Sequence, residues 1–130
     1  MNNYSKQRKT VLEAIKNTRT HPTAEKIYSM ALKEEPKISK STVYRNINIL
    51  VENGVIKRIT IPNRPDRYDY LYDNHQHAIC TECGKVFDFF YSFDKEKIEE
   101  SIREQLGKEF EIDCVKIVGI CENCKSKNKN

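Results

Sequence analysis

Four of the five cysteines fall into two Cys-x-x-Cys pairs, and this feature constrains the fold more than any other. The pairs are Cys80 with Cys83 and Cys121 with Cys124, and 37 residues separate Cys83 from Cys121. Two such pairs supply the four thiolates of a tetrahedral zinc site. A strand–helix–strand insert would bring the two pairs together. The alternative is a redox dithiol, which needs a cysteine of low pKa.

The fifth cysteine, Cys114, lies outside both pairs, and we expect it to be a small buried side chain on a strand. An odd number of cysteines does not suit a secreted disulfide framework, so paired spacings favour zinc in a reducing compartment. The chain has no apolar run of about 18 residues and no apolar segment behind a basic N-terminus. We therefore expect a cytoplasmic protein without a membrane span or signal peptide.

The net charge of +4 is unevenly distributed along the chain. Residues 1–66 carry 13 Lys/Arg against 6 Asp/Glu, whereas residues 67–130 carry 10 against 13. A basic first half joined to an acidic second half favours a nucleic-acid-binding domain attached to another domain. Uneven surface charge without function is the alternative.

The first half predicts three helices followed by a hairpin. Apolar residues recur at helical spacing in residues 6–17, in residues 24–33 and after Ser39. Thr23 and Ser39 are the expected N-caps, and Gly54 is expected to end the third helix. Residues 55–61 and 67–72 alternate as strands around a turn at 63–66. This order is that of a winged helix-turn-helix domain, in which the third helix is the recognition helix.

The second half predicts a small sheet with one helix. Residues 73–77 are expected to be a linker, followed by a strand, the first cysteine pair and a strand over 85–91. A helix begins near Asp94 and ends at Gly107, and a strand over 110–120 leads to the second pair and a frayed tail. So small a sheet favours dimerisation. The fold class is α+β, with a winged-helix domain over 1–72, a hinge over 73–77 and an α/β dimerisation domain over 78–130.

All three histidines precede the first cysteine pair. His75 and His77, two positions apart, lie on the same side of an extended segment, and Asp69, Asp73 and Asp88 are nearby in sequence. Nitrogen and oxygen donors suit iron, manganese or zinc. The alternative is a solvated linker. His21 carries less weight, because capping by Thr23 explains its segment without a metal.

Several motifs in order resemble the ferric uptake regulator family over nearly the whole chain. They are the sequences over residues 21–25 (HPTAE), 41–45 (STVYR), 67–69 (RYD), 75–85 (HQHAICTECGK) and 119–124 (GICENC). The resemblance implies a homodimeric, metal-dependent transcription repressor. Its partner would be double-stranded operator DNA that is palindromic and A/T-rich.

Carried over by position, the resemblance assigns a role to each motif. Structural Zn²⁺ falls on Cys80, Cys83, Cys121 and Cys124, and a regulatory Fe²⁺ or Mn²⁺ falls on His21, Asp69, His75, His77 and Asp88. DNA contacts are expected from the recognition helix and the turn at 63–66, at Ser41, Thr42, Tyr44, Arg45 and Arg64. For Tyr44, core packing beside Val43 is the alternative.

Asp88 distinguishes between branches of the family. Peroxide-sensing members usually have Asp at this position, whereas iron-uptake regulators usually have Glu. This implies peroxide sensing through oxidation of a liganding histidine, His21 or His75. An iron, zinc or manganese uptake regulator is the alternative. The family's additional metal site is expected to be absent, and without a Ser-His-Asp order or a phosphate-binding glycine loop we expect no enzyme.

Overall fold

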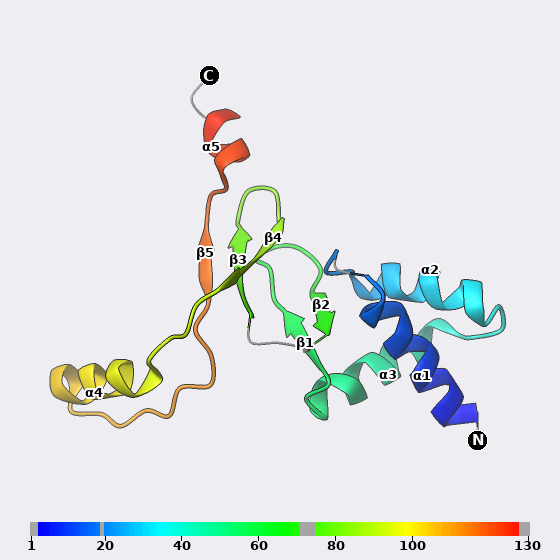
Figure 1. Ribbon diagram of the computed structural model, residues 1–130, viewed down its shortest axis with the longest axis horizontal. Coiled ribbons are helices and arrows are strands. Elements are labelled where there is room, and N and C mark those ends of the chain that lie inside the picture. The colour runs from blue at the N-terminus through cyan, green and yellow to red at the C-terminus, as the bar shows by residue number, and fades with distance from the viewer. Residues whose placement is uncertain (1–2, 19, 71–74, 128–130) are drawn as a thin grey trace. The chain divides into compact units, whose positions relative to one another are not determined.

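The first half of the chain forms three helices and a two-stranded antiparallel sheet (Figure 1). The computed structural model describes residues 3–18, 20–70 and 75–127, and it divides into two units, Met1–Asp73 and Asn74–Asn130. The elements of the first unit are α1 (Asn3–Lys16), α2 (Ala24–Glu34), α3 (Lys40–Glu52), β1 (Ile56–Ile59) and β2 (Arg67–Tyr70).

The predicted helix caps are confirmed. The side-chain oxygen of Thr23 accepts a hydrogen bond from the backbone N–H of Lys26 (3.2 Å), and that of Ser39 accepts one from Thr42 (3.1 Å). Each bond satisfies a backbone donor that the first turn of a helix leaves without an intrahelical partner. Gly54, after α3, has φ +72°, which favours glycine. The polar caps therefore set where α2 and α3 begin.

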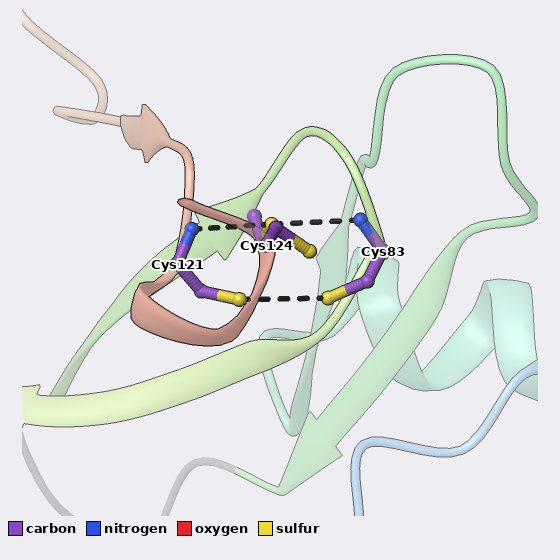
Figure 2. A group of neighbouring side chains, drawn as sticks. Cys83, Cys121 and Cys124 are labelled. Atoms are coloured by element: carbon purple, nitrogen blue, oxygen red, sulfur yellow. Dashed lines mark hydrogen bonds between the residues drawn. The ribbon is translucent and has the colours of Figure 1, made fainter. Parts of the chain in front are cut away.

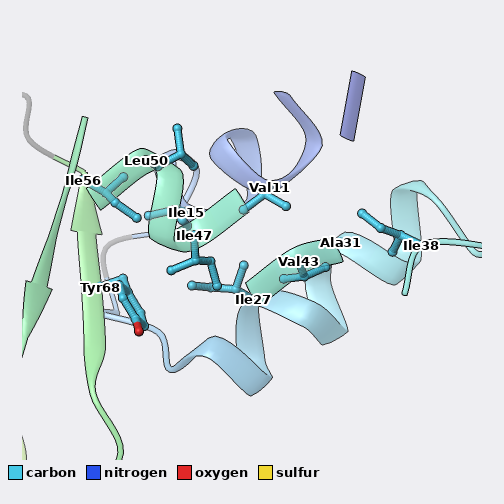
Figure 3. Packing of buried hydrophobic residues seen from close by; sticks show 10 residues of the cluster. All are labelled: Val11, Ile15, Ile27, Ala31, Ile38, Val43, Ile47, Leu50, Ile56 and Tyr68. Atoms are coloured by element: carbon cyan, nitrogen blue, oxygen red, sulfur yellow. The ribbon is translucent and has the colours of Figure 1, made fainter. Parts of the chain in front are cut away.

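Apolar faces of the three helices meet the hairpin in one core (Figure 3). Val11 and Ile15 of α1 are fully buried, as are Ile27 of α2 and Val43 of α3. The ten members of the cluster are Val11, Ile15, Ile27, Ala31, Ile38, Val43, Ile47, Leu50, Ile56 and Tyr68. Burial of side chains this large supplies most of the stability of a unit of this size.

The hairpin pairs in a single antiparallel register, from Ile56 opposite Tyr70 to Ile59 opposite Arg67. The turn between the strands includes Asn63, whose φ of +61° is of the kind that asparagine tolerates. The hairpin expected from the alternating pattern is thus confirmed, with shorter strands. Residues 71–72 of the predicted second strand lie outside the described residues.

The second unit is a three-stranded sheet with two helices. Its elements are β3 (His75–Cys80), β4 (Val86–Phe90), α4 (Lys95–Leu106), β5 (Ile117–Gly119) and α5 (Glu122–Lys127). The strand order is β4-β3-β5, with β3 antiparallel to β4 and parallel to β5 (Figure 1). Asp94 caps α4 by accepting from the Lys97 N–H, and Gly107 ends it with φ +65°, as predicted.

Four expectations for the second half are wrong. Residues 75–77 are the start of β3 rather than a linker, because they pair with β4. The strand expected over 110–120 is confined to Ile117–Gly119, since the described residues offer no strand that pairs with 110–116. Residues 125–127, expected to be frayed, belong to α5. Cys114 lies in the unpaired segment and is exposed, not buried.

The second unit has a small core. Among its described residues, the buried apolar side chains are Ile79, Cys80 and Val86. Large apolar side chains are exposed instead, among them Phe90 (75%), Phe110 (58%) and Ile120 (50%). No helix among residues 3–18, 20–70 and 75–127 is long and apolar enough to cross a membrane.

Candidate metal centres and nucleic-acid interface

The two cysteine pairs meet at one end of the three-stranded sheet. β3 ends at Cys80, Cys83 follows in the turn, Cys121 directly precedes α5, and Cys124 lies in its first turn. The four sulfur atoms lie within 4.8 Å of one another. Figure 2 shows the sulfurs of Cys83 and Cys121 pointing toward each other, 3.9 Å apart. Four sulfurs at about 2.3 Å from a tetrahedral zinc are separated by about 3.8 Å, so this spacing fits the ion.

Backbone hydrogen bonds hold the cysteine turn in place. The Thr81 N–H donates to the Gly119 carbonyl (2.8 Å), which ties the turn to β5. The Gly84 N–H donates to the Cys80 carbonyl (2.9 Å), and φ at Gly84 is +76°. Glycine at this position lets the chain turn back into β4, as expected from the sequence.

The electrostatics of the sulfurs favour a bound cation. The backbone N–H of Cys121 points at the Cys80 sulfur (3.3 Å), as does that of Cys83 (3.5 Å), and these bonds lower the pKa of Cys80 from 9.0 to about 6. Burial, followed by hydrogen bonds to the neighbouring sulfurs, raises the pKa of Cys124 to about 12. One thiolate therefore forms readily, whereas four in one cluster need a cation to balance their charge.

A second set of donors lies on the opposite half of β3 and on β4. The His75 and His77 side chains share a face of β3, and Asp88 is the cross-strand neighbour of His77. The Nε2 atoms of the two histidines are 3.1 Å apart, and the Asp88 Oδ1 lies 3.6 Å from that of His75 and 3.4 Å from that of His77. Ligands at about 2.1 Å from one ion are separated by roughly 3.0–3.4 Å, so these three donors fit a metal.

The first unit carries two further donors of the same kind. The His21 Nε2 lies 3.5 Å from the Asp69 Oδ2, and both side chains are buried. His21 precedes α2, and Asp69 lies in β2. The N–H of Tyr68 donates to the Pro22 carbonyl (3.0 Å), which brings the His21 segment against β2. A buried imidazole beside a buried carboxylate offers one nitrogen and one oxygen donor of the kind that suits iron, manganese or zinc.

The face of α3 away from the core carries the predicted DNA contacts. Tyr44 is 36% exposed, and Ser41 and Arg45 are exposed as well, whereas Thr42 is half-buried beside the Ser39 cap. The Lys40 ammonium lies 5.7 Å from the ring centroid of Tyr44. Arg64 is exposed in the hairpin turn. Tyr44 therefore does not pack in the core beside Val43.

Two arginines of the hairpin, Arg58 and Arg67, have contacts that the sequence did not suggest. The Arg58 guanidinium donates to the Asn48 side chain (2.5 Å) and lies 3.6 Å from Asp66. That of Arg67 donates to the His21 carbonyl (3.0 Å). Arg67 entered the sequence argument only through a family motif, because bonds to a distant backbone leave no periodic signal.

Comparison with known proteins identifies the family. The model of the ferric uptake regulator family matches residues 2–118. The peroxide operon regulator of Bacillus subtilis is 33% identical over 124 residues, which cover 95% of this chain and 85% of that protein. The chain belongs to the ferric uptake regulator family. Its members regulate transcription and are not enzymes, so the thiol-oxidoreductase alternative is not supported.

Solved structures of the family share the fold. The peroxide stress regulator of Campylobacter jejuni is 30% identical, with a TM-score of 0.69 over 93% of this chain and 88% of that one. The ferric uptake regulator of Helicobacter pylori is 26% identical, with a TM-score of 0.74 over 92% and 80%, and has three functional metal-binding sites. The predicted mixture of helices and sheets is thus confirmed at the level of the family fold.

Proposed function

We propose that this member of the ferric uptake regulator family is a metal-dependent DNA-binding repressor that senses hydrogen peroxide. The observation that carries the proposal is the presence of two kinds of donor: four clustered cysteine sulfurs, and imidazoles beside carboxylates at His21–Asp69 and, separately, at His75, His77 and Asp88. Soft thiolates suit a permanent zinc ion, and the harder donors suit an exchangeable Fe²⁺ or Mn²⁺. The peroxide regulators among its relatives support the response to peroxide.

The thiolate cluster is proposed as a structural zinc site. Cys80 and Cys83 would join β3 to β4, and Cys121 and Cys124 would attach β5 and α5 to the same ion. All four positions are filled by protein, which is typical of structural zinc and leaves no site for substrate. Zinc would thereby replace part of the core that the second unit lacks.

The regulatory ion is proposed to take ligands from both units. His21 and Asp69 supply two donors, and His75, His77 and Asp88 supply three. Neither set alone fills the coordination sphere of a six-coordinate ion. An ion that binds all five side chains would favour one arrangement of the two units over others. The size of this shift is limited by the difference between the ion's affinities for those arrangements.

The first unit is proposed as a winged-helix DNA-binding domain, with α3 in the major groove and the β1–β2 turn as the wing. Tyr44 and Arg45 would contact base edges, Ser41 and Thr42 the backbone, and Arg64 a phosphate. The excess of basic residues in this half supports phosphate binding. Two recognition helices in a homodimer would read a palindromic, A/T-rich operator in the cytoplasm.

The second unit is proposed as the dimerisation domain. Its exposed apolar side chains, including Phe90, Phe110, Val118 and Ile120, offer apolar surface that a second copy can cover. Burial between two copies would remove them from water. A two-fold axis then relates the two recognition helices.

Peroxide would act on the histidine ligands. Bound Fe²⁺ supplies the one-electron chemistry that activates peroxide, whereas Mn²⁺ does not supply it readily. One oxygen atom of hydrogen peroxide would add to a ring carbon of His21 or His75, and the other would leave as water. The oxidised ring would be a weaker nitrogen donor to the metal. The weakened site would release its metal, and operator affinity would fall.

A metal-uptake regulator of the same family is the second candidate, favoured by the similarity to the Helicobacter pylori regulator. Operator binding separates the two functions. An operator duplex is first selected from a random pool with the Mn²⁺-loaded protein, and binding is then measured with Fe²⁺ or Mn²⁺, with and without peroxide. A peroxide sensor loses binding only with Fe²⁺ and peroxide together. Equal binding in all four conditions would favour the uptake regulator.

A further inference from the structure

His21 has a backbone conformation that needs explanation. Among the described residues, His21 and Asn63 are the non-glycine residues with positive φ, at +54° and +61°. Asn63 lies in the hairpin turn, where asparagine tolerates such values. His21 precedes Pro22, which restricts its backbone further. A residue held in this region is strained, and surrounding contacts must maintain it.

Arg67 supplies those contacts from the first position of β2. Its Nη1 donates to the His21 carbonyl at 3.0 Å and to the Thr20 carbonyl at 3.4 Å. On the other side of His21, the Pro22 carbonyl accepts from the Tyr68 N–H, and Thr23 forms a bridge with Arg67. Arg67 thus fixes the carbonyl groups on either side of the His21 α-carbon, and Tyr68 fixes the next carbonyl, that of Pro22.

The spacing of Arg67 and Asp69 makes this arrangement specific to the His21 ring. Residues two apart in a strand project to the same face. Arg67 therefore meets the backbone of the His21 segment while Asp69 meets its imidazole, with the Nε2 3.5 Å from the Asp69 Oδ2. A guanidinium presents its donors in a rigid fork, so it holds carbonyl groups in one orientation better than a lysine does.

We propose that Arg67 is a positioning residue that holds His21 ready to bind the regulatory metal. The inference rests on the proposed role of His21 as a ligand. In the absence of Arg67, the His21 backbone would relax toward common conformations and turn its ring away from Asp69. Metal binding would then have to restore the strained conformation, which lowers the affinity.

The test is Mn²⁺ binding to the full-length, zinc-loaded protein, measured by titration calorimetry. Arg67→Met should bind Mn²⁺ roughly 10-fold more weakly, as is typical when a residue that orients a metal ligand is lost. Arg67→Lys should fall between this variant and the wild type. The matched control is Arg58→Met, which removes the same charge from the same hairpin and should bind like the wild type. Zinc content and far-UV circular dichroism report whether each variant is folded.

A double mutant separates positioning from general stability. If Arg67 acts through His21, then adding Arg67→Met to His21→Ala should weaken Mn²⁺ binding no further. An additive loss, or equal losses in Arg67→Met and Arg58→Met, would overturn the role of Arg67. If His21→Ala binds Mn²⁺ as the wild type does, the proposed ligand set itself is wrong, and this outcome is distinct from a failure of Arg67 alone.

Discussion

Loss of one zinc ligand should unfold the second unit and leave the first intact. Cys124→Ser replaces a half-buried sulfur with a hydroxyl, which is a poor zinc ligand at neutral pH. The first unit has no part in the cluster, and its core lies within residues 11–68. The effect of the substitution should therefore end at the boundary between the units.

The magnitudes favour zinc over the core as the source of stability in the second unit. Among its described residues, the buried apolar side chains other than the proposed ligand Cys80 are Ile79 and Val86, and each contributes about 1.5–3 kcal/mol. Structural zinc contributes roughly 10–16 kcal/mol at pH 7. Each ordered residue costs about 1–2 kcal/mol of backbone entropy, so the two buried side chains of one copy cannot by themselves hold the unit folded.

The assay is two-dimensional NMR of the full chain, with zinc counted by native mass spectrometry. Cys124→Ser should lose zinc, and the amide signals of residues 75–127 should collapse while those of α1–α3 stay dispersed. Cys114→Ser, which changes an exposed cysteine outside the cluster, should keep one zinc and the wild-type spectrum. A folded, zinc-containing Cys124→Ser protein, or equal zinc loss in Cys114→Ser, would refute the reasoning.

Three further predictions concern the core, the DNA interface and pH. Ile47→Ala should lower the free energy of unfolding of the first unit by about 2–5 kcal/mol and Ile47→Val by about 0.5–1.5, measured by thermal melting; equal effects would contradict the close packing at this site. Arg45→Ala should cost about 1–3 kcal/mol of operator affinity and relax the preference at one base pair. Arg64→Ala should weaken binding to all DNA sequences alike and reduce the slope of log affinity against log salt concentration by about 1. Competition binding at several salt concentrations measures the base preference and the salt dependence of each variant. A loss of base preference in Arg64→Ala together with a reduced salt slope in Arg45→Ala would reverse the assigned roles. Zinc binds deprotonated cysteines, so protons compete with zinc for the four sulfurs and the zinc affinity falls as the pH is lowered. In the zinc-loaded full chain, the second unit should unfold at a lower urea concentration at pH 6 than at pH 8, and the opposite order would contradict the assignment.

Local chemistry made much of the fold predictable. Thr23 and Ser39 cap their helices because a side-chain oxygen next to a helical pattern satisfies the same donors in any context. Alternation placed His75 and His77 on one face. The same rule did not reveal that Asp88 would lie opposite His77, because strand register depends on pairing and not on sequence spacing.

Features that depend on distant partners were not predictable. Residues 110–116 have a strand-like sequence but no partner strand among the described residues. The predicted strand was therefore too long, and the prediction that Cys114 is buried was wrong. The helix α5 is short and polar, and backbone bonds such as that from Lys125 to Cys121 maintain it. The contact of Arg67 with the His21 carbonyl spans 46 residues and carries no periodic signal.

The most direct test of peroxide sensing is peptide mass spectrometry of the Fe²⁺-loaded protein after brief exposure to hydrogen peroxide. The account predicts one added oxygen on the peptide that contains His21 or on the one that contains His75. The Mn²⁺-loaded protein treated in the same way should remain unmodified at both. Loss of operator binding with neither histidine modified in the Fe²⁺-loaded protein would contradict the account.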